Sequence, residues 1–212
     1  ISPPSTPVKN VNDKPTGSIG DIGCFSFYAG KNLGAYGEGG AVTTNNEELY
    51  NKMAIIRDHG SSKKYHHDVI GHNYRLEGIQ AAILNVKLKY LNEWNEKRRK
   101  NATLYAEYLI DVNQVVTPVI SNFAEHVFHL YVIRAKKRDE LMAYLQDNNI
   151  YCGLHYPIPL HMQKAYLGLG YNKGDFPIAE QYANEIISLP MYPELPEEHI
   201  KYVCEKIRAF YN

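Results

Sequence analysis

The chain lacks an excess of charge of either sign and any long apolar run. Among its 212 residues, 23 basic side chains balance 23 acidic ones, so electrostatic capture of nucleic acid or of an anionic membrane is not expected. No apolar stretch approaches the roughly 20 residues that a membrane-spanning helix needs. These absences argue against nucleic-acid and membrane partners.

Cysteine is also scarce. The three cysteines are scattered, odd in number and without metal-type spacing: Cys24, Cys152 and Cys204. We interpret them as reduced, small apolar residues, and residues 1–5 lack the pattern of a signal peptide, so we expect a cytoplasmic protein. The pair His66 and His67 has no third ligand nearby in the sequence, and no metal is expected.

The first 110 residues predict two short strands, one capped helix and one long helix. The elements are expected at 22–28 and 39–44 (strands), 45–57 (helix), 58–72 (polar loop) and from about 75 to 109 (long helix). Asn45 or Asn46 is suited to cap the first helix. An unbroken second helix would be about 50 Å long, so a kink or two abutting helices is expected. Its charged band, 93–100, is most simply a solvated face.

Shorter elements follow after about residue 110. Strands are expected at 127–135 and 150–156, and helices at 137–148, 177–188 and 197–211. This order predicts an α/β chain in two parts, with residues 1–110 ending in the long helix and residues 111–212 forming a small α+β domain.

The most informative stretch is 20–34, where a predicted strand delivers Lys31 into a glycine-rich turn. Lysine forms Schiff bases with aldehydes, and pyridoxal phosphate is the cofactor that most often uses one. Ser26 could turn its hydroxyl toward a phosphate, and Asn73 stands where the long helix is expected to begin, at an end that favours anions. The alternative is an ordinary surface lysine.

Seven segments of the sequence form a recognisable series, in chain order SFYAGKNL (26–33), GEGGA (37–41), RDHG (57–60), GHNYRL (71–76), IQAAIL (79–84), HLYVIR (129–134) and HYPIPLH (155–161). Together they resemble the DegT/DnrJ/EryC1/StrS family of pyridoxal-phosphate-dependent nucleotide-sugar aminotransferases. The similarity runs from about Gly17 to the end of the chain. It implies part of fold type I of the pyridoxal-phosphate-dependent transferases: the end of the large domain with the lysine strand, a long connecting helix and a small C-terminal α+β domain.

The resemblance also implies a cofactor site. Lys31 would form the Schiff base with pyridoxal 5'-phosphate and later serve as the base that moves the proton. Ser26 would hydrogen-bond the cofactor phosphate. Asn73 would reach the phosphate of the neighbouring subunit's cofactor, so the sites would lie at a homodimer interface.

Substrate contacts are implied for three further residues. Arg75 would help to hold the nucleotide-sugar, His155 would lie near the sugar pocket, and Tyr28 is a candidate beside them. Each has a plainer alternative, a surface charge for Arg75 and packing for His155 and Tyr28. His161, like the remaining loop histidines, is interpreted as a loop or surface residue.

The resemblance covers roughly the second half of such an enzyme. By the family's spacing, the carboxylate facing the pyridinium nitrogen would fall at residues 1–5, which hold no Asp or Glu. We therefore expect an incomplete enzyme whose exposed sheet edges favour self-association, with a rearranged core around 20–45 as the alternative.

The expected reaction moves an amino group from glutamate to a nucleotide-linked keto-sugar. The related branch that dehydrates sugars carries His in place of the lysine, so Lys31 argues against it. The alternative is an inactive chain that serves as an oligomerisation or assembly partner.

Overall fold

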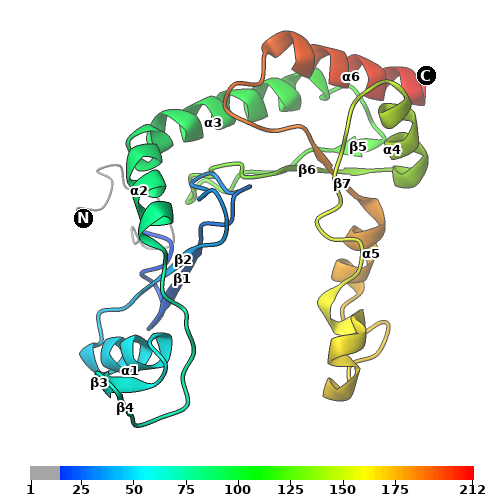
Figure 1. Cartoon of the computed structure of the whole chain (residues 1–212). Helices are drawn as coiled ribbons and strands as arrows, with labels where there is room; N and C mark the ends of the chain where they lie inside the picture. Colours follow the sequence, from blue (N-terminus) through cyan, green and yellow to red (C-terminus); the bar gives the residue numbers. More distant parts are fainter. Residues whose placement is uncertain (1–14) are drawn as a thin grey trace. The chain divides into compact units, whose positions relative to one another are not determined.

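The computed structural model describes residues 15–212, which form two compact units (Figure 1). The first extends to Trp94 and includes Ser121–His126, and the second comprises Asn95–Ile120 and Val127–Asn212. Both contain helices and strands, so the content is mixed α/β. The boundary near residue 110 expected from the sequence stays a prediction, and residues 1–5 lie outside the described part. No helix within residues 15–212 has the length and apolarity needed to cross a bilayer.

The first unit contains a short antiparallel ladder followed by a capped helix. Strands β1 (Gly23–Ser26) and β2 (Gly40–Thr43) pair with Ser26 opposite Gly40. Helix α1 (Glu47–Arg57) begins after Asn46, whose side chain accepts a hydrogen bond from the Leu49 N–H at 3.1 Å. The cap satisfies one of the free N–H groups of the first turn. Both strands and the cap are confirmed.

Two expectations about the region after α1 are corrected or refined. The expected loop over 58–72 contains a small hairpin, β3 (Ser61–Lys63) and β4 (His66–His67). The long helical stretch begins at Gly78 and is divided by a 3-10 turn at Leu88–Tyr90 into α2 (Gly78–Lys87) and α3 (Leu91–Tyr108). The expected interruption is confirmed, but the start at residue 75 was wrong.

The second unit is built on a three-stranded antiparallel sheet. Its strands, in spatial order, are β5 (Val115–Val116), β6 (Tyr131–Ala135) and β7 (Ile186–Leu189). The helices are α4 (Arg138–Asp147), α5 (Pro177–Glu185) and α6 (Glu197–Tyr211), with 3-10 turns at Leu160–Met162 and Lys164–Leu169. Fully buried side chains from α3, β6, α4, β7 and α6 form one core: Tyr105, Ile133, Leu141, Ile187, Ile200 and Ile207.

Strand β7 was not expected. The helix predicted over 177–188 ends at Glu185, and the apolar run behind it extends into the sheet. The strand predicted over 150–156 was also wrong, because this segment makes only a single bridge, between Gly153 and Ser188.

A row of polar side chains on α3 holds the segment that follows β7. Arg98 donates to the Met191 carbonyl at 3.1 Å, and Asn101 donates to that of Tyr192 at 3.0 Å. The Tyr105 hydroxyl donates to the carbonyl of Pro190 at 2.9 Å. Arg98 is buried, so it departs from the solvated face expected over 93–100, whereas most of the other charged residues of this band are exposed. Buried carbonyls require such donors, and this row fixes the end of β7.

Candidate functional site

Lys31 lies in the connection between β1 and β2, and the backbone closes this connection tightly. The Lys31 N–H donates to the Tyr28 carbonyl at 2.8 Å. Beyond the ladder, Phe27 donates its N–H to the Gly39 carbonyl and accepts from the Ala35 N–H, both at 2.8 Å. The turn bearing Lys31 is therefore defined by hydrogen bonds at its base as well as within it.

Helix α2 also holds this turn. The Lys87 ammonium donates to the Gly34 carbonyl, and the Gln80 side chain accepts from the Tyr36 N–H at 2.8 Å. Gln80 and Lys87 stand seven positions apart, which places them on one helix face. A Cβ at Gly34 would lie 2.2 Å from the Ala29 carbonyl oxygen, so the close approach of the chain requires glycine. The two α2 side chains were not identified from the sequence, because they contact positions 44 and 53 residues away.

The turn offers a set of groups that fits an aldehyde and a phosphate. Lys31 is half-buried, and within residues 15–212 no carboxylate forms an ion pair with its amine. The exposed Ser26 hydroxyl accepts from the Tyr28 N–H at 3.3 Å, which leaves its own proton to donate. The Tyr28 ring is more than half exposed. A hydroxyl donor at the end of β1 and an amine and an aromatic ring on the turn behind it thus come from one short segment.

Asn73 and Arg75 lie on a segment that is attached to the end of α1. Asn73 forms a backbone bridge with Asp58, and the Arg75 guanidinium pairs with the Asp58 carboxylate. Both side chains of the pair are about half exposed, 50% and 49%, so the pair contributes at most about 1 kcal/mol. Asn73 precedes Gly78 by five residues and does not lie at the helix N-terminus. The argument from the helix dipole is therefore wrong for Asn73.

His155 belongs to the second unit, separate from the unit that carries the other predicted site residues. Its Nδ1 lies 2.8 Å from the hydroxyl oxygen of Ser188 on β7. The Tyr156 ring contacts the imidazole edge-on, with centroids 5.5 Å apart. Ser188 was missed because its strand was interpreted as the end of a helix.

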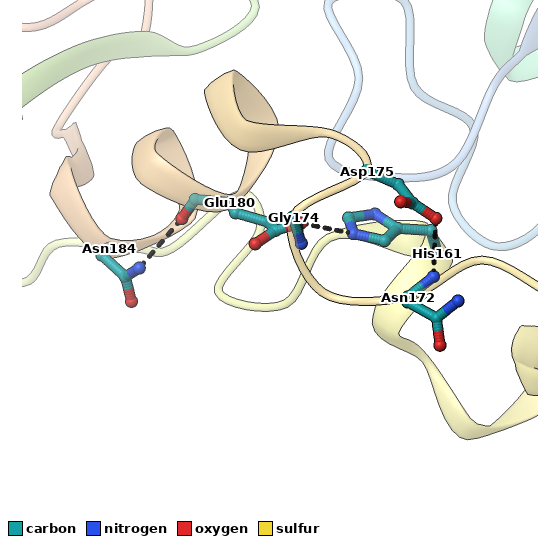
Figure 2. A network of polar contacts seen from close by, with 6 residues as sticks. All are labelled: His161, Asn172, Gly174, Asp175, Glu180 and Asn184. Carbon is teal, nitrogen blue, oxygen red and sulfur yellow. Dashed lines mark hydrogen bonds and ion pairs between the residues drawn. The ribbon is translucent and has the colours of Figure 1, made fainter.

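His161 was interpreted as a loop or surface residue, and this is wrong. Its ring is buried, with Nε2 2.9 Å from the Glu180 carboxylate on α5. Figure 2 shows this network, in which Glu180 also accepts from the Gly174 N–H at 2.7 Å. Nearby, the Asp175 carboxylate accepts from the Asn172 N–H at 2.8 Å. The network joins the loop before α5 to the 3-10 turn that carries His161.

An apolar cavity of about 440 Å³ lies against this network. It is lined by Pro159, Leu160, His161, Tyr166, Leu169, Tyr171, Phe176 and Ala179. The rings of Tyr171 and Phe176 meet edge-on with centroids 5.2 Å apart. Within residues 15–212, no group of three or more His, Cys, Asp or Glu side chains is placed to hold a metal ion.

Comparison with known proteins places the chain in a family. The sequence profile of the DegT/DnrJ/EryC1/StrS aminotransferase family matches residues 8–208. The chain belongs to this family. Membership confirms the resemblance found in the sequence, and the lysine segment and the C-terminal segments that carried it both lie inside the match.

The relatives that this chain resembles include proteins named as a regulator and proteins named as sugar transaminases. The "pleiotropic regulatory protein" of Geobacillus stearothermophilus is 50% identical over 95% of this chain and 55% of its own length. A dTDP-3-amino-3,6-dideoxy-alpha-D-galactopyranose transaminase of Aneurinibacillus thermoaerophilus is 43% identical over 94% of the chain and 54% of its own length. The chain thus spans about half the length of the curated relatives it matches.

The fold agrees with solved members of the family. The crystal structure of Streptomyces venezuelae DesV in complex with a ketimine intermediate superposes with a TM-score of 0.88 at 37% identity. The match covers 93% of this chain and 53% of DesV. The family and its solved members are pyridoxal-phosphate-dependent aminotransferases with mixed α/β content.

The Glu180 network predicts a pH-dependent stability. The Gly174 N–H, and then His161, hold the pKa of Glu180 below its usual value. As the pH falls, the Glu180 carboxylate is therefore protonated in the unfolded chain before it is protonated in the folded protein. The stabilisation that the carboxylate gives to the fold is complete above the unfolded pKa of about 4.3 and is lost as the pH falls through the lower folded pKa. We expect Glu180→Gln to lower the urea midpoint at about pH 6, and the gap to the unaltered protein to narrow by about pH 3.5.

The matched control is Glu107→Gln, which neutralises an exposed carboxylate on α3. Its urea midpoint should follow that of the unaltered protein across the same pH range. If the difference in urea midpoint between Glu180→Gln and the unaltered protein stays constant with pH, the charge of the Glu180 carboxylate does not contribute to stability.

Proposed function

We propose that this chain carries the lysine-bearing part of a pyridoxal-phosphate-dependent aminotransferase of fold type I. The reaction moves an amino group from glutamate to a nucleotide-linked keto-sugar. The observation that carries the proposal is the Lys31 amine, which forms no ion pair within the described part of the chain, in a turn held by α2, with the Ser26 hydroxyl at the end of the strand that leads into this turn. Family membership and the match to DesV support it.

Each residue of the turn has a role that its chemistry allows. Bound pyridoxal phosphate supplies a ring that accepts the electron pair left when a substrate carbon loses its proton. Lys31 would hold the cofactor through its amine and, once displaced by the substrate amine, would serve as the base that moves the proton. Ser26 donates its hydroxyl proton to the phosphate. The hydrogen bonds at the base of the turn keep these two groups on a fixed backbone.

The remaining residues act on the substrate and on a second copy of the chain. Asn73 donates its amide to the phosphate of the cofactor bound by that second copy. Arg75 gives one N–H to Asp58 and retains the other donors of its guanidinium for the nucleotide-sugar. Tyr28 offers an exposed ring to the sugar. His155, which belongs to the second unit, is proposed separately as a sugar contact through a ring nitrogen. The relatives named as transaminases of dTDP- and UDP-linked sugars support this substrate class.

An assembly or regulatory role is the second candidate. It is favoured by the relative from Geobacillus stearothermophilus, which is 50% identical to this chain and is named a pleiotropic regulatory protein. Such a role does not require a cofactor held stoichiometrically by Lys31. Titration with pyridoxal phosphate therefore separates the two candidates.

Replacing Lys31 tests the catalytic proposal. The unaltered protein titrated with pyridoxal phosphate should develop the visible absorbance of a lysine-bound pyridoxal ring, saturating at one cofactor per chain. Lys31→Ala should lose this saturable absorbance completely, because the other amine at the turn, that of Lys87, is already hydrogen-bonded to the Gly34 carbonyl. The measurement is an absorbance titration near neutral pH, where unspecific reaction of protonated surface lysines is slow.

The matched control is Lys89→Ala, which removes an exposed lysine from the 3-10 turn between α2 and α3. It should titrate like the unaltered protein. Equal absorbance in Lys31→Ala and in the unaltered protein would contradict the catalytic proposal, and no saturable absorbance in any variant would favour the assembly role.

The role given to Asn73 requires self-association, and the β1–β2 ladder supports it. Within residues 15–212 the two strands pair only with each other, so both outer edges are unpaired. Phe25 and Val42 on these strands are 38% and 51% exposed. Open edges with apolar side chains favour pairing with another chain. Light scattering at micromolar concentration should give the mass of a dimer or larger species, whereas a monodisperse monomer would contradict this arrangement.

A further inference from the structure

Ser188 occupies a buried and hydrogen-bonded position beside His155. It lies on β7 opposite Val132 of β6, and on its other side it exchanges both backbone hydrogen bonds with Gly153, at 2.8 and 3.0 Å. Its side chain is buried, with 4% of the residue exposed. The row of α3 donors holds the chain immediately after β7. The hydroxyl of Ser188 therefore projects from backbone that is fixed on both edges.

The hydroxyl selects one form of the His155 ring. Ser188 Oγ lies 2.8 Å from Nδ1 of His155, and the described part of the chain gives this hydroxyl proton no other acceptor. A buried donor without an acceptor is costly, so the hydroxyl donates to Nδ1. A neutral imidazole that accepts at Nδ1 carries its proton on Nε2. The half-buried ring is thus left with one N–H donor for a ligand.

Gly153 provides the space for this arrangement. A Cβ at position 153 would lie 2.7 Å from Cε1 and 3.3 Å from Nδ1 of His155. Any side chain there would displace the ring from Ser188. The position of the His155 ring therefore depends on the Ser188 hydroxyl and on the glycine at position 153, which has no side chain to displace the ring.

We propose that Ser188 is a positioning residue, which holds His155 so that its Nε2–H donates to an oxygen of the nucleotide-linked sugar. This inference rests on the proposed function, because the sugar is the ligand that the function assigns to the site. Ser188 itself does not contact the ligand. Its effect passes through the tautomer and the orientation of His155.

The tautomer is tested directly by imidazole ¹⁵N NMR on the protein without ligand. In the unaltered protein above neutral pH, the His155 signals, assigned by their absence in His155→Gln, should show an unprotonated Nδ1 and a protonated Nε2. In Ser188→Ala both signals should move toward the average of two tautomers. Ser188→Thr, which keeps the hydroxyl, should restore the original pattern.

Ligand binding is tested in the same variants by calorimetry with dTDP-glucose and UDP-N-acetylglucosamine as probes. Ser188→Ala and Gly153→Ala should each weaken binding of the preferred probe by roughly threefold to tenfold, the effect of one hydrogen bond. Ser188→Thr should bind within about twofold of the unaltered protein. Gly168→Ala is the matched control, because a Cβ there meets nothing within 4 Å, and it should bind normally.

Each outcome has one meaning. Averaged tautomers in the unaltered protein, or unchanged ¹⁵N signals in Ser188→Ala, would overturn the positioning role. Normal binding by His155→Gln and Ser188→Ala, in a protein that does bind a probe, would overturn the inference while leaving the proposed function intact. If the expected tautomer is present but the unaltered protein binds neither probe, both the proposed substrate class and the contact of His155 with the sugar would be contradicted. The NMR result would then show only that Ser188 sets the tautomer of His155.

Discussion

The candidate site depends on the attachment of the lysine turn to α2. A two-stranded ladder is marginally stable by itself, and β1 and β2 contribute only four residues each. Lys87 and Gln80 bind the turn at Gly34 and at Tyr36, so the helix supplies the support that the strands lack. The position of the Lys31 amine therefore follows from contacts between α2 and the backbone, more than from strand pairing.

The second unit achieves rigidity differently. Its sheet is packed on helices around one apolar core, and the α3 donors hold the backbone that leaves β7. Ser188 is part of β7, and His155 is held to it by the side-chain hydrogen bond to Ser188 and by the backbone bridge between Gly153 and Ser188. The loop before α5 has no sheet to support it and relies on the Glu180 carboxylate instead.

Local signals in the sequence predicted local structure well. The Asn46 cap, both strands around Lys31 and the full extent of α6 are confirmed because capping, turn residues and amphipathic spacing act within a few positions. Strand β7 was missed because the apolar residues of Ile186–Leu189 directly continue an amphipathic helix, and a short apolar run does not distinguish helix from strand.

Contacts between distant positions explain most of the remaining differences. Glu180 forms a hydrogen bond with His161, which is 19 positions away, and Arg98 donates to the carbonyl of Met191, which is 93 positions away. No window of neighbouring residues contains such information. The residues of the lysine turn could be proposed because their motif is contiguous, whereas the support from α2 and the pairing of His155 with Ser188 required the fold.

The most direct test of the central claim is to reduce the protein with borohydride in the presence of stoichiometric pyridoxal phosphate and to map the peptides by mass spectrometry. If the turn presents its amine to the cofactor, a single pyridoxyl adduct should lie on Lys31. Adducts spread over exposed lysines such as Lys63 and Lys89, with Lys31 unmodified, would contradict the account.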